Sequence, residues 1–305
     1  MSLANPHTTG ETERYERYLT TERHAAALTT SAYLRDLRQF IDYLQATGKD
    51  DIAKVTAQDV RRWVLTLMDK EGDTPRSVRR KLSSLNSFFR FEMREGKMTK
   101  NPARLVIVPK MAKTLPYFFQ EKEMDAALDR QEANGEEETL EEMRDQLILD
   151  LFYQTGMRVS ELCNVKESDF DYSRRSLKVI GKRQKERRIP LGDGIIASVR
   201  AYVERRNAEI GKTERLLTRM SGEAVYPRMV YNIVKEHMSR VSTLGKRSPH
   251  VLRHTFASTL LNAGADIYAV KELLGHASLA STEIYTHSTF AQLLKTYKQA
   301  HPRGS

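Results

Sequence analysis

Apolar residues recur at three- and four-residue intervals through residues 11–96, which is the spacing of helices with one buried face. This pattern predicts four helices, the first of them over about residues 11–26. Each of the other three is expected to begin after a threonine that can cap it: Thr30, Thr56 and Thr74, the last followed by Pro75 at the first helical position. The N-terminal part of the chain is therefore expected to form a four-helix unit.

Prolines interrupt the helical pattern from Pro102 to Pro116, and this segment is predicted to be an interdomain linker. A residue that precedes a proline is disfavoured in the helical conformation, so repeated prolines prevent a continuous helix. We place the boundary near residue 110, which divides the chain into domains of residues 1–110 and 111–305.

The second domain combines helices with a small β-sheet. Helical patterns are found over about 120–133, 139–155, 194–210, 226–243, 250–263, 266–274 and 279–298. A β-prone run at 176–180 and a second at 188–191 predict a hairpin. The expected fold class is mainly α with a small β-sheet: a helical N-terminal domain followed by an α+β domain.

Charge is distributed unevenly along the chain, which has 50 Lys and Arg residues and 40 Asp and Glu residues. Residues 121–145 contain eleven acidic and three basic residues, so the remainder carries 47 basic against 29 acidic residues. Such an excess favours binding to nucleic acid, because each neutralised phosphate releases counterions. Solvated surface charge is the alternative, and it applies equally to the basic cluster near the start of the fourth helix: Arg76, Arg79, Arg80 and Lys81.

Several classes of protein are disfavoured by what the chain lacks. No stretch approaches about 18 consecutive apolar residues, and the N-terminal residues lack a basic region followed by an apolar one, so export is not expected. A single cysteine, Cys163, cannot form an internal disulfide, so a cytoplasmic protein is expected. The phosphate loop, the dinucleotide fingerprint and the serine-hydrolase elbow are all missing. His250 and His254 have the spacing of a zinc pair, but Arg253 between them would repel the metal.

Six residues near turns and helix ends could share one site: Arg158, Lys182, His250, Arg253, His276 and Tyr285. Each has an ordinary structural explanation by itself, such as a helix-end charge or a packed tyrosine. Together they suit attack on a phosphodiester, because two arginines can stabilise the negative charge that develops on five-coordinate phosphorus. A phenol activated by this cationic environment can be the nucleophile. The covalent phosphotyrosine would retain the energy of the broken ester, so no ATP is needed.

Five segments that contain these residues resemble the signature boxes of the tyrosine recombinases, most closely those of the Xer subgroup. They are Thr155–Leu162 (TGMRVSEL), Ile180–Arg187 (IGKRQKER), Pro249–Ala257 (PHVLRHTFA), Leu274–Ser278 (LGHAS) and Ile284–His287 (IYTH). The four-helix unit resembles the SAM-like core-binding domain of that family, and the remainder resembles its catalytic domain. The resemblance thus covers nearly the whole chain.

The resemblance implies a role for each residue of the site. Arg158 and Arg253 would hold the scissile phosphate, and Tyr285 would be the nucleophile. Lys182 would be the general acid that protonates the leaving 5′-oxygen. The remaining members would assist them: His250 and His276 in proton transfer, and Glu161 in orienting the active site.

The hairpin is implied to contact DNA, because the family places it in the minor groove. Its candidate DNA-binding residues are Arg183, Lys185 and Arg187, in addition to Arg76, Arg79, Arg80 and Lys81 of the N-terminal domain. The hairpin turn departs from the usual family pattern, since Lys-Arg-Gln-Lys replaces a turn that contains glycine. This leaves the geometry of the turn open.

The resemblance also implies site-specific recombination of double-stranded DNA through a 3′-phosphotyrosyl intermediate and a Holliday junction, without metal or other cofactor. The active form would be a tetramer of this chain, or of this chain with a paralogous recombinase, in which the C-terminal helix Phe290–Gln299 docks on the neighbouring subunit. Xer-type enzymes resolve chromosome dimers at a dif-type site, often with an FtsK-type translocase. A minimal integrase of a mobile element, a type IB topoisomerase-like enzyme and a non-catalytic DNA-binding protein remain alternatives.

Overall fold

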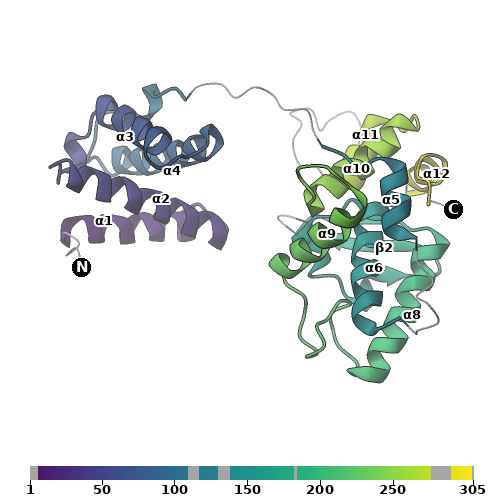
Figure 1. Ribbon diagram of the computed structural model, residues 1–305. Helices are drawn as coiled ribbons and strands as arrows, with labels where there is room; N and C mark the ends of the chain where they lie inside the picture. The colour runs from purple at the N-terminus through teal and green to yellow at the C-terminus, as the bar shows by residue number, and fades with distance from the viewer. Residues whose placement is uncertain (1–5, 109–116, 130–137, 182–183, 276–289, 304–305) are drawn as a thin grey trace. The chain divides into compact units, whose positions relative to one another are not determined.

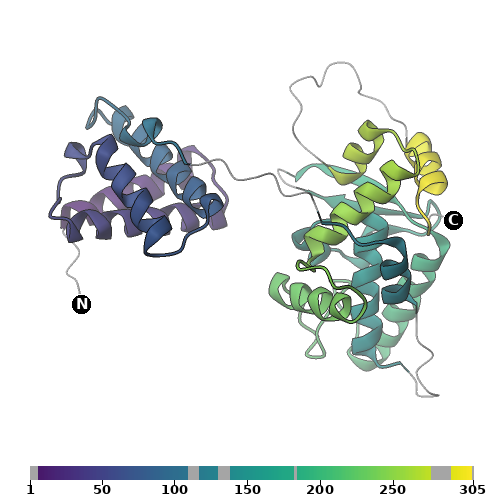
Figure 2. The same cartoon turned by 45° about the horizontal axis from the view of Figure 1, so that its top comes forward.

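The computed structural model describes residues 6–108, 117–129, 138–181, 184–275 and 290–303 (Figures 1 and 2). The chain divides into two compact units, Met1–Thr114 and Leu115–Ser305. The first unit is helical and the second combines helices with one three-stranded sheet, which confirms the predicted fold class. None of the helices formed by the described residues has both the length and the apolar character needed to cross a membrane.

Helices α1 to α4 form the N-terminal unit, with short helical turns between and after them. Its elements are α1 (Pro6–Arg17), η1 (Tyr18–Glu22), α2 (Ala27–Ala46), η2 (Ile52–Lys54), α3 (Ala57–Asp69), α4 (Pro75–Arg94) and η3 (Pro102–Leu105). Aromatic side chains fill its core, where the ring of Phe40 meets those of Trp63 and Phe89 at centroid distances of 4.9 and 6.1 Å. This unit therefore has a hydrophobic core of its own.

Two of the three predicted helix caps are confirmed. The Thr56 side chain accepts a hydrogen bond from the backbone N–H of Asp59, whose carboxylate accepts one from the Thr56 N–H in return. Thr74 caps α4 by accepting a hydrogen bond from the backbone N–H of Ser77, with Pro75 at the first helical position. These caps satisfy backbone N–H groups that have no partner within the helix.

The start of α2 and the end of the first helix differ from the prediction. Thr30 lies inside α2, whose N-cap is Ala26, and its side chain is buried in the first turn instead of capping the helix. The first helix is α-helical only to Arg17 and continues as the π-helical turn η1. Tyr15 and Leu19 on either side of this change are both buried, so the switch keeps both apolar side chains in the core.

The C-terminal unit is built around one central helix, α6 (Leu140–Thr155). Figure 1 shows α6 in the middle of this unit, and helices α5, α8, α9 and α10 pack against it. The remaining helices are α5 (Glu121–Leu128), α7 (Val159–Leu162), α8 (Asp193–Glu209), α9 (Pro227–Val241), α10 (Pro249–Asn262), α11 (Ile267–Leu274) and α12 (Phe290–Ala300). Residues 147–155 of α6 are all buried, as expected for a helix surrounded by others.

The sheet is antiparallel with strand order β1-β2-β3: β1 (Phe170–Asp171), β2 (Ser176–Ile180) and β3 (Glu186–Pro190). Strands β2 and β3 confirm the predicted hairpin, whereas β1, of two residues, had no sequence pattern to reveal it. In the hairpin Val179 pairs with Arg187 and Lys178 with Arg188. Because side chains alternate between the faces of a strand, these two pairs lie on opposite faces of the sheet.

The C-terminal helix α12 packs within its own chain, against α10, α11 and β3 (Figure 2). Tyr297 of this helix is fully buried, and its hydroxyl lies 3.4 Å from Oε1 of Gln154 in α6. Tyr297 belongs to the hydrophobic core of the unit that contains it. Docking of this helix on a neighbouring subunit stays a prediction.

His301, directly after α12, fixes the end of the chain. Its Nε2 lies 3.1 Å from the carbonyl oxygen of Tyr153, and its Nδ1 accepts a hydrogen bond from the N–H of Arg303. Nε2 therefore carries the proton of a neutral ring. Burial lowers the pKa of His301 from its usual 6.5 to about 4.

Acidification is expected to weaken the C-terminal unit through His301. His301 binds a proton near pH 6.5 in the unfolded chain and only near pH 4 in the folded chain. The free energy of unfolding is therefore highest above pH 6.5 and decreases as the pH falls towards 4. The largest loss is about 3 kcal/mol. Denaturant unfolding at about pH 7.5 and about pH 5 should show a smaller loss in His301→Gln than in the parent chain. Equal losses in both chains would contradict this assignment.

Candidate functional site

Arg158 lies just after the end of α6, where Gly156 turns the chain. Gly156 has φ +55°, and a Cβ added to it would lie 2.4 Å from a ring carbon of Phe256. Only glycine fits this left-handed, crowded position. The turn brings Arg158 to the N-terminus of the short helix α7, with 39% of its side chain exposed.

Glu161 connects Arg158 to the rest of the site. Its carboxylate accepts hydrogen bonds from the backbone N–H and from Nη1 of Arg158, both at 2.8 Å. Arg187 donates two more, from Nη1 at 3.0 Å and Nη2 at 2.8 Å. Burial alone would raise the pKa of Glu161, but the bonds from Arg187 and Arg158 outweigh it and hold the pKa below its usual value. Glu161 is therefore an ionised carboxylate shared by two arginines.

Arg253 lies deeper in the unit, only 5% exposed, on helix α10. Its Nη1 donates to the carbonyl of Gly156 at 2.5 Å and its Nη2 to the carbonyl of Leu274 at 2.6 Å. Burial, and then the charge of Arg158, lower the pKa of Arg253 to about 10, so the side chain stays cationic at neutral pH. The charges of Arg158 and Arg253 therefore lie close together, and positive charge is concentrated here.

His250 begins α10 together with Pro249, one helical turn before Arg253. Its side chain is exposed, and its ring lies 4.5 Å from that of His254 in an edge-to-face arrangement. The structure thus presents the first histidine of the box at the surface, in the same turn that contains the buried arginine.

Lys182, His276, Tyr285 and Arg183 lie outside the described residues. The residues that precede the first two in the chain are described and lie at the arginine cluster. A Cβ added to Gly181, before Lys182, would be 3.4 Å from Oε1 of Glu161. The carbonyl of Gly275, before His276, accepts a hydrogen bond from Nη2 of Arg158 at 3.2 Å. Four of the five sequence boxes therefore have described residues that meet at one place.

The candidate DNA-binding residues of the hairpin differ in how exposed their side chains are. Lys185 is exposed, as expected for a DNA contact. Arg187 differs from that expectation, because its side chain is only 10% exposed and is committed to Glu161. Gln184 has φ +59°, so a non-glycine residue adopts the left-handed conformation in the turn that lacks glycine.

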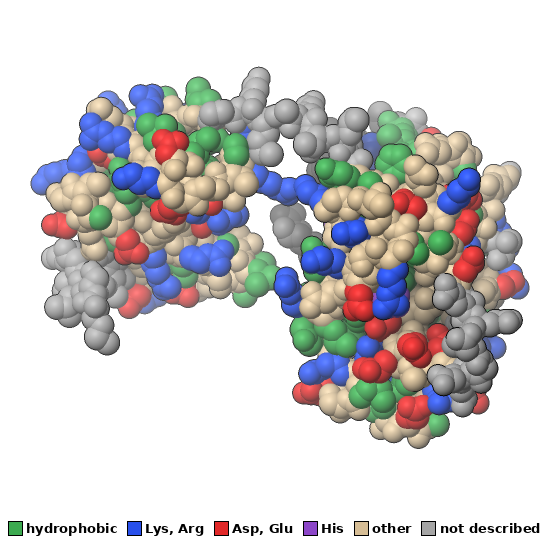
Figure 3. All heavy atoms as spheres, viewed as in Figure 1, with side chains coloured by type: hydrophobic (Ala, Val, Ile, Leu, Met, Phe, Trp, Pro, Cys, Tyr) green, Lys and Arg blue, Asp and Glu red, His purple; other side chains and the backbone are tan. Residues whose placement is uncertain are grey.

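The basic cluster of α4 is also divided. Arg76 and Arg79 are exposed, whereas Arg80 forms an ion pair with buried Asp36. Lys81 is buried and its ammonium lies 2.5 Å from the carboxylate of Asp73. Arg76 and Arg79 therefore remain the better candidates for phosphate contacts in this cluster. Figure 3 shows further lysine and arginine side chains on the visible face of each unit, with acidic side chains between them.

Two family models match the chain. The model of the phage integrase family covers residues 118–292, and that of the phage integrase N-terminal SAM-like domain covers residues 12–96. Each match falls within one of the two structural units. The catalytic match includes all six residues expected to form the active site.

Curated relatives and solved structures agree with these models. The chain is 37% identical to tyrosine recombinase XerC of Chlorobaculum tepidum (94% of this chain, 93% of the relative) and 38% identical to XerC of Bacillus pumilus (94% of each). In fold it is similar to XerH recombinase bound to a difH substrate, with TM-score 0.67, 21% identity and coverage of 93% of this chain and 83% of that one. A lambda integrase fragment bound to a core site gives TM-score 0.68, 21% identity and coverage of 92% and 99%. The chain therefore belongs to the phage integrase family, as an Xer-type tyrosine recombinase that cleaves and rejoins DNA at specific sites.

Proposed function

We propose that this recombinase resolves chromosome dimers in the cytoplasm by acting at a dif-like site. Cleavage proceeds through a 3′-phosphotyrosyl bond to Tyr285, and strand exchange proceeds through a Holliday junction. The enzyme works as a tetramer on DNA, with itself or a paralogous recombinase, and a FtsK-type translocase controls the reaction. Similarity to XerC relatives over most of the chain supports the chromosomal role, and the XerH neighbour with its difH substrate supports the type of site.

The observation that carries the chemistry is the meeting of Arg158 and Arg253 around the end of α11. Both guanidinium groups are held by hydrogen bonds to backbone or carboxylate oxygens. Preorganised cations of this kind stabilise charge that develops in a transition state without having to reorganise. They suit the non-bridging oxygens of a phosphodiester under attack. Tyr285 supplies the attacking oxygen, Lys182 the proton for the leaving 5′-oxygen, and His250 and His276 assist.

A trapping experiment tests this function. Covalent protein–DNA adducts are first recovered from cells that produce the chain, and the attached DNA is sequenced. A duplex of that sequence, nicked so that the cleaved end diffuses away, is then incubated with the purified chain. We expect an adduct whose mass maps to Tyr285 and a recovered sequence from one chromosomal locus. Recovery of mobile-element ends would favour the integrase alternative, relaxation of supercoils without strand exchange would favour the topoisomerase, and absence of any adduct would leave DNA binding alone.

Lys182 is expected to matter least when the leaving group needs no proton. Lys182→Ala should slow cleavage of an ordinary duplex by about 10²- to 10⁴-fold, the usual contribution of a general acid. A duplex with sulfur in place of the 5′-oxygen has a thiolate leaving group, so its cleavage should be slowed far less. Rates measured on both duplexes provide the comparison. Equal slowing would remove Lys182 as the acid.

The exposed arginines of α4 are expected to contribute to the salt dependence of DNA binding. Arg76→Gln is expected to reduce the slope of log affinity against log salt by about 1, because one phosphate contact is lost. Arg94→Gln is the matched control, since Arg94 lies at the other end of the same helix and is paired with Glu22 at 2.6 Å. Binding titrations between about 50 and 200 mM salt measure both slopes. Slopes that fall equally in both variants would contradict a contact specific to Arg76.

A further inference from the structure

Arg187 is a cation turned towards the interior of the catalytic unit. It lies on strand β3 on the same face as buried Ile189, and all three of its guanidinium nitrogens donate hydrogen bonds. Two of these bonds go to the carboxylate of Glu161, and Nε donates to the carbonyl of Leu273 at 2.8 Å. With these contacts and 10% exposure, the side chain is arranged to hold protein groups.

Glu161 transmits the position of Arg187 to Arg158. Oε1 of Glu161 accepts from Nη1 of both arginines, at 3.0 and 2.8 Å, and Oε2 accepts from Arg187 Nη2 and from the Arg158 backbone. The carboxylate is 4% exposed, so water cannot readily replace a lost arginine. A change in Arg187 therefore alters the environment that orients the guanidinium group of Arg158.

The end of α11 is held by the same set of side chains. Its last two carbonyl groups and that of Gly275, the residue after it, each accept a hydrogen bond from a different arginine: Leu273 from Arg187 at 2.8 Å, Leu274 from Arg253 at 2.6 Å and Gly275 from Arg158 at 3.2 Å. Gly275 has φ +64°, and an added Cβ would lie 3.1 Å from Nη1 of Arg187, so the backbone and this guanidinium group are closely packed. The three arginines therefore form one connected arrangement with the helix end.

We propose that Arg187 is a positioning residue of the recombinase and makes no contact with DNA. It fixes Glu161 and the end of α11, and through them the two guanidinium groups, Arg158 and Arg253, that receive the scissile phosphate. This inference rests on the proposed function of those two arginines. Substitution of Arg187 lowers the rate at which bound DNA is cleaved, while the affinity for DNA is nearly unchanged.

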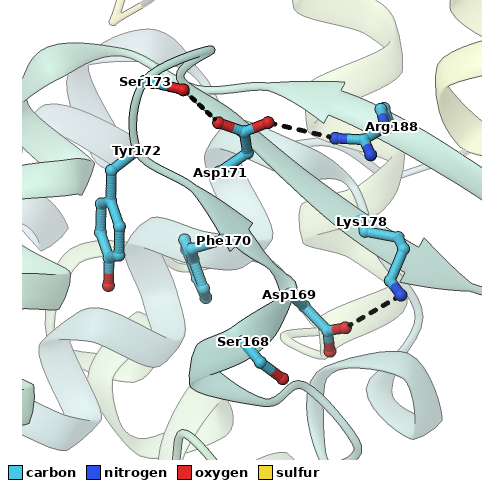
Figure 4. A pocket seen from close by; sticks show the side chains of 8 residues that line it. All are labelled: Ser168, Asp169, Phe170, Asp171, Tyr172, Ser173, Lys178 and Arg188. Carbon is cyan, nitrogen blue, oxygen red and sulfur yellow. Dashed lines mark hydrogen bonds and ion pairs between the residues drawn. The ribbon is translucent and has the colours of Figure 1, made fainter.

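Arg188 is a matched control, because it is adjacent in sequence and faces the other way. It lines a pocket of about 370 Å³ on the opposite face of the sheet (Figure 4), where its Nη1 lies 3.6 Å from a carboxylate oxygen of Asp171. Its side chain is 46% exposed, and Lys178 beside it faces Asp169. Replacing either arginine with glutamine lowers the net charge of the hairpin by the same one unit.

The test measures single-turnover cleavage at saturating concentrations of the nicked duplex identified above. Arg187→Gln and Arg187→Lys should both lower the rate by about 10- to 100-fold, the range for residues that orient active-site groups. Lysine retains the charge but cannot donate bidentately to Glu161. The dissociation constant should change less than about twofold and the salt slope should stay the same. Arg188→Gln should cleave within about twofold of the parent chain.

A double substitution separates positioning from general damage to the fold. If Arg187 acts through Glu161, Arg187→Gln combined with Glu161→Gln should cleave no more slowly than the slower single variant. Losses that multiply would mean that the two residues act independently and would overturn the proposal. So would unchanged cleavage by Arg187→Lys together with a salt slope reduced by about 1 in Arg187→Gln, since loss of the charge would then remove a phosphate contact.

Amide hydrogen exchange of the DNA-free chain tests the positioning role of Arg187 independently of DNA cleavage. Arg187→Lys should accelerate amide exchange in the last turn of α11 by about 10-fold or more, and Arg188→Gln should not. If the parent chain forms no covalent adduct, the proposed function fails, while exchange still reports whether Arg187 holds the helix end. Unaltered exchange in Arg187→Lys would overturn the positioning role. Because lysine preserves the charge, this variant also serves if Arg187→Gln does not fold.

Discussion

Replacing Tyr285 with phenylalanine is expected to abolish the covalent protein–DNA adduct. The substitution removes only the phenolic oxygen, which is the proposed attacking atom, so no other group of the side chain can take over the reaction. Cleavage should fall by about 10⁴-fold or more, as it does when a nucleophile is removed from other enzymes. Binding of the duplex should be retained, because the basic surface is intact. Denaturing electrophoresis of the trapped duplex measures the adduct.

Tyr297→Phe is the matched control for this experiment. Tyr297 lies near Tyr285 in sequence, but its hydroxyl is buried within the core, 3.4 Å from Gln154. Its removal leaves the apolar packing of the ring in place, so the adduct should form as in the parent chain. An adduct that persists in Tyr285→Phe, or disappears only in Tyr297→Phe, would assign the nucleophile elsewhere.

Arg253→Lys is expected to lower the cleavage rate by about 10²- to 10³-fold at saturating DNA. The arginine places two N–H groups in a fixed plane, on the carbonyls of Gly156 and Leu274, and a lysine ammonium cannot reproduce that geometry. Positive charge is conserved, so DNA affinity should change far less than the rate. A rate close to that of the parent chain would mean that charge alone is sufficient.

The control for Arg253 is Arg247→Lys. Arg247 precedes the same helix and donates to the carbonyl of Ser242 at 2.8 Å, so it has a similar hydrogen bond without belonging to the arginine cluster. Its cleavage rate should stay within about twofold of that of the parent chain. Comparison of the two variants separates loss of the guanidinium geometry at the site from loss of an arginine hydrogen bond in general.

Most of the fold could be predicted because its helices are amphipathic and their starts are marked by local chemistry. Thr56 and Thr74 form caps within three residues of themselves, so neighbouring sequence is sufficient to identify them. Thr30 has the same side chain, but it lies on the buried face of α2, and only packing against the rest of the unit decides that. Strand β1 consists of two residues, too few for an alternating pattern.

The family boxes predict the candidate site residues, but they do not predict the contacts that these residues make. The family resemblance predicts a DNA contact for Arg187, because this residue belongs to the basic hairpin that the family places in the minor groove. One feature of the sequence does predict that Arg187 lies on the buried face of the strand. It precedes the apolar Ile189 by two positions, and residues two apart share one face of a strand. The acidic partner, Glu161, lies 26 positions earlier in the chain, so pairing it with Arg187 required the folded structure.

Cys163, the one cysteine in the chain, is buried against the core, and burial raises the pKa of its thiol to about 11. Maleimide reagents react with thiolates, which this residue scarcely forms at neutral pH. A fluorophore or spin label attached to a new surface cysteine on either unit would therefore report from that position alone. With one such label on each unit, the distance between the two labels could be measured with and without DNA, in a chain whose native cysteine is left in place.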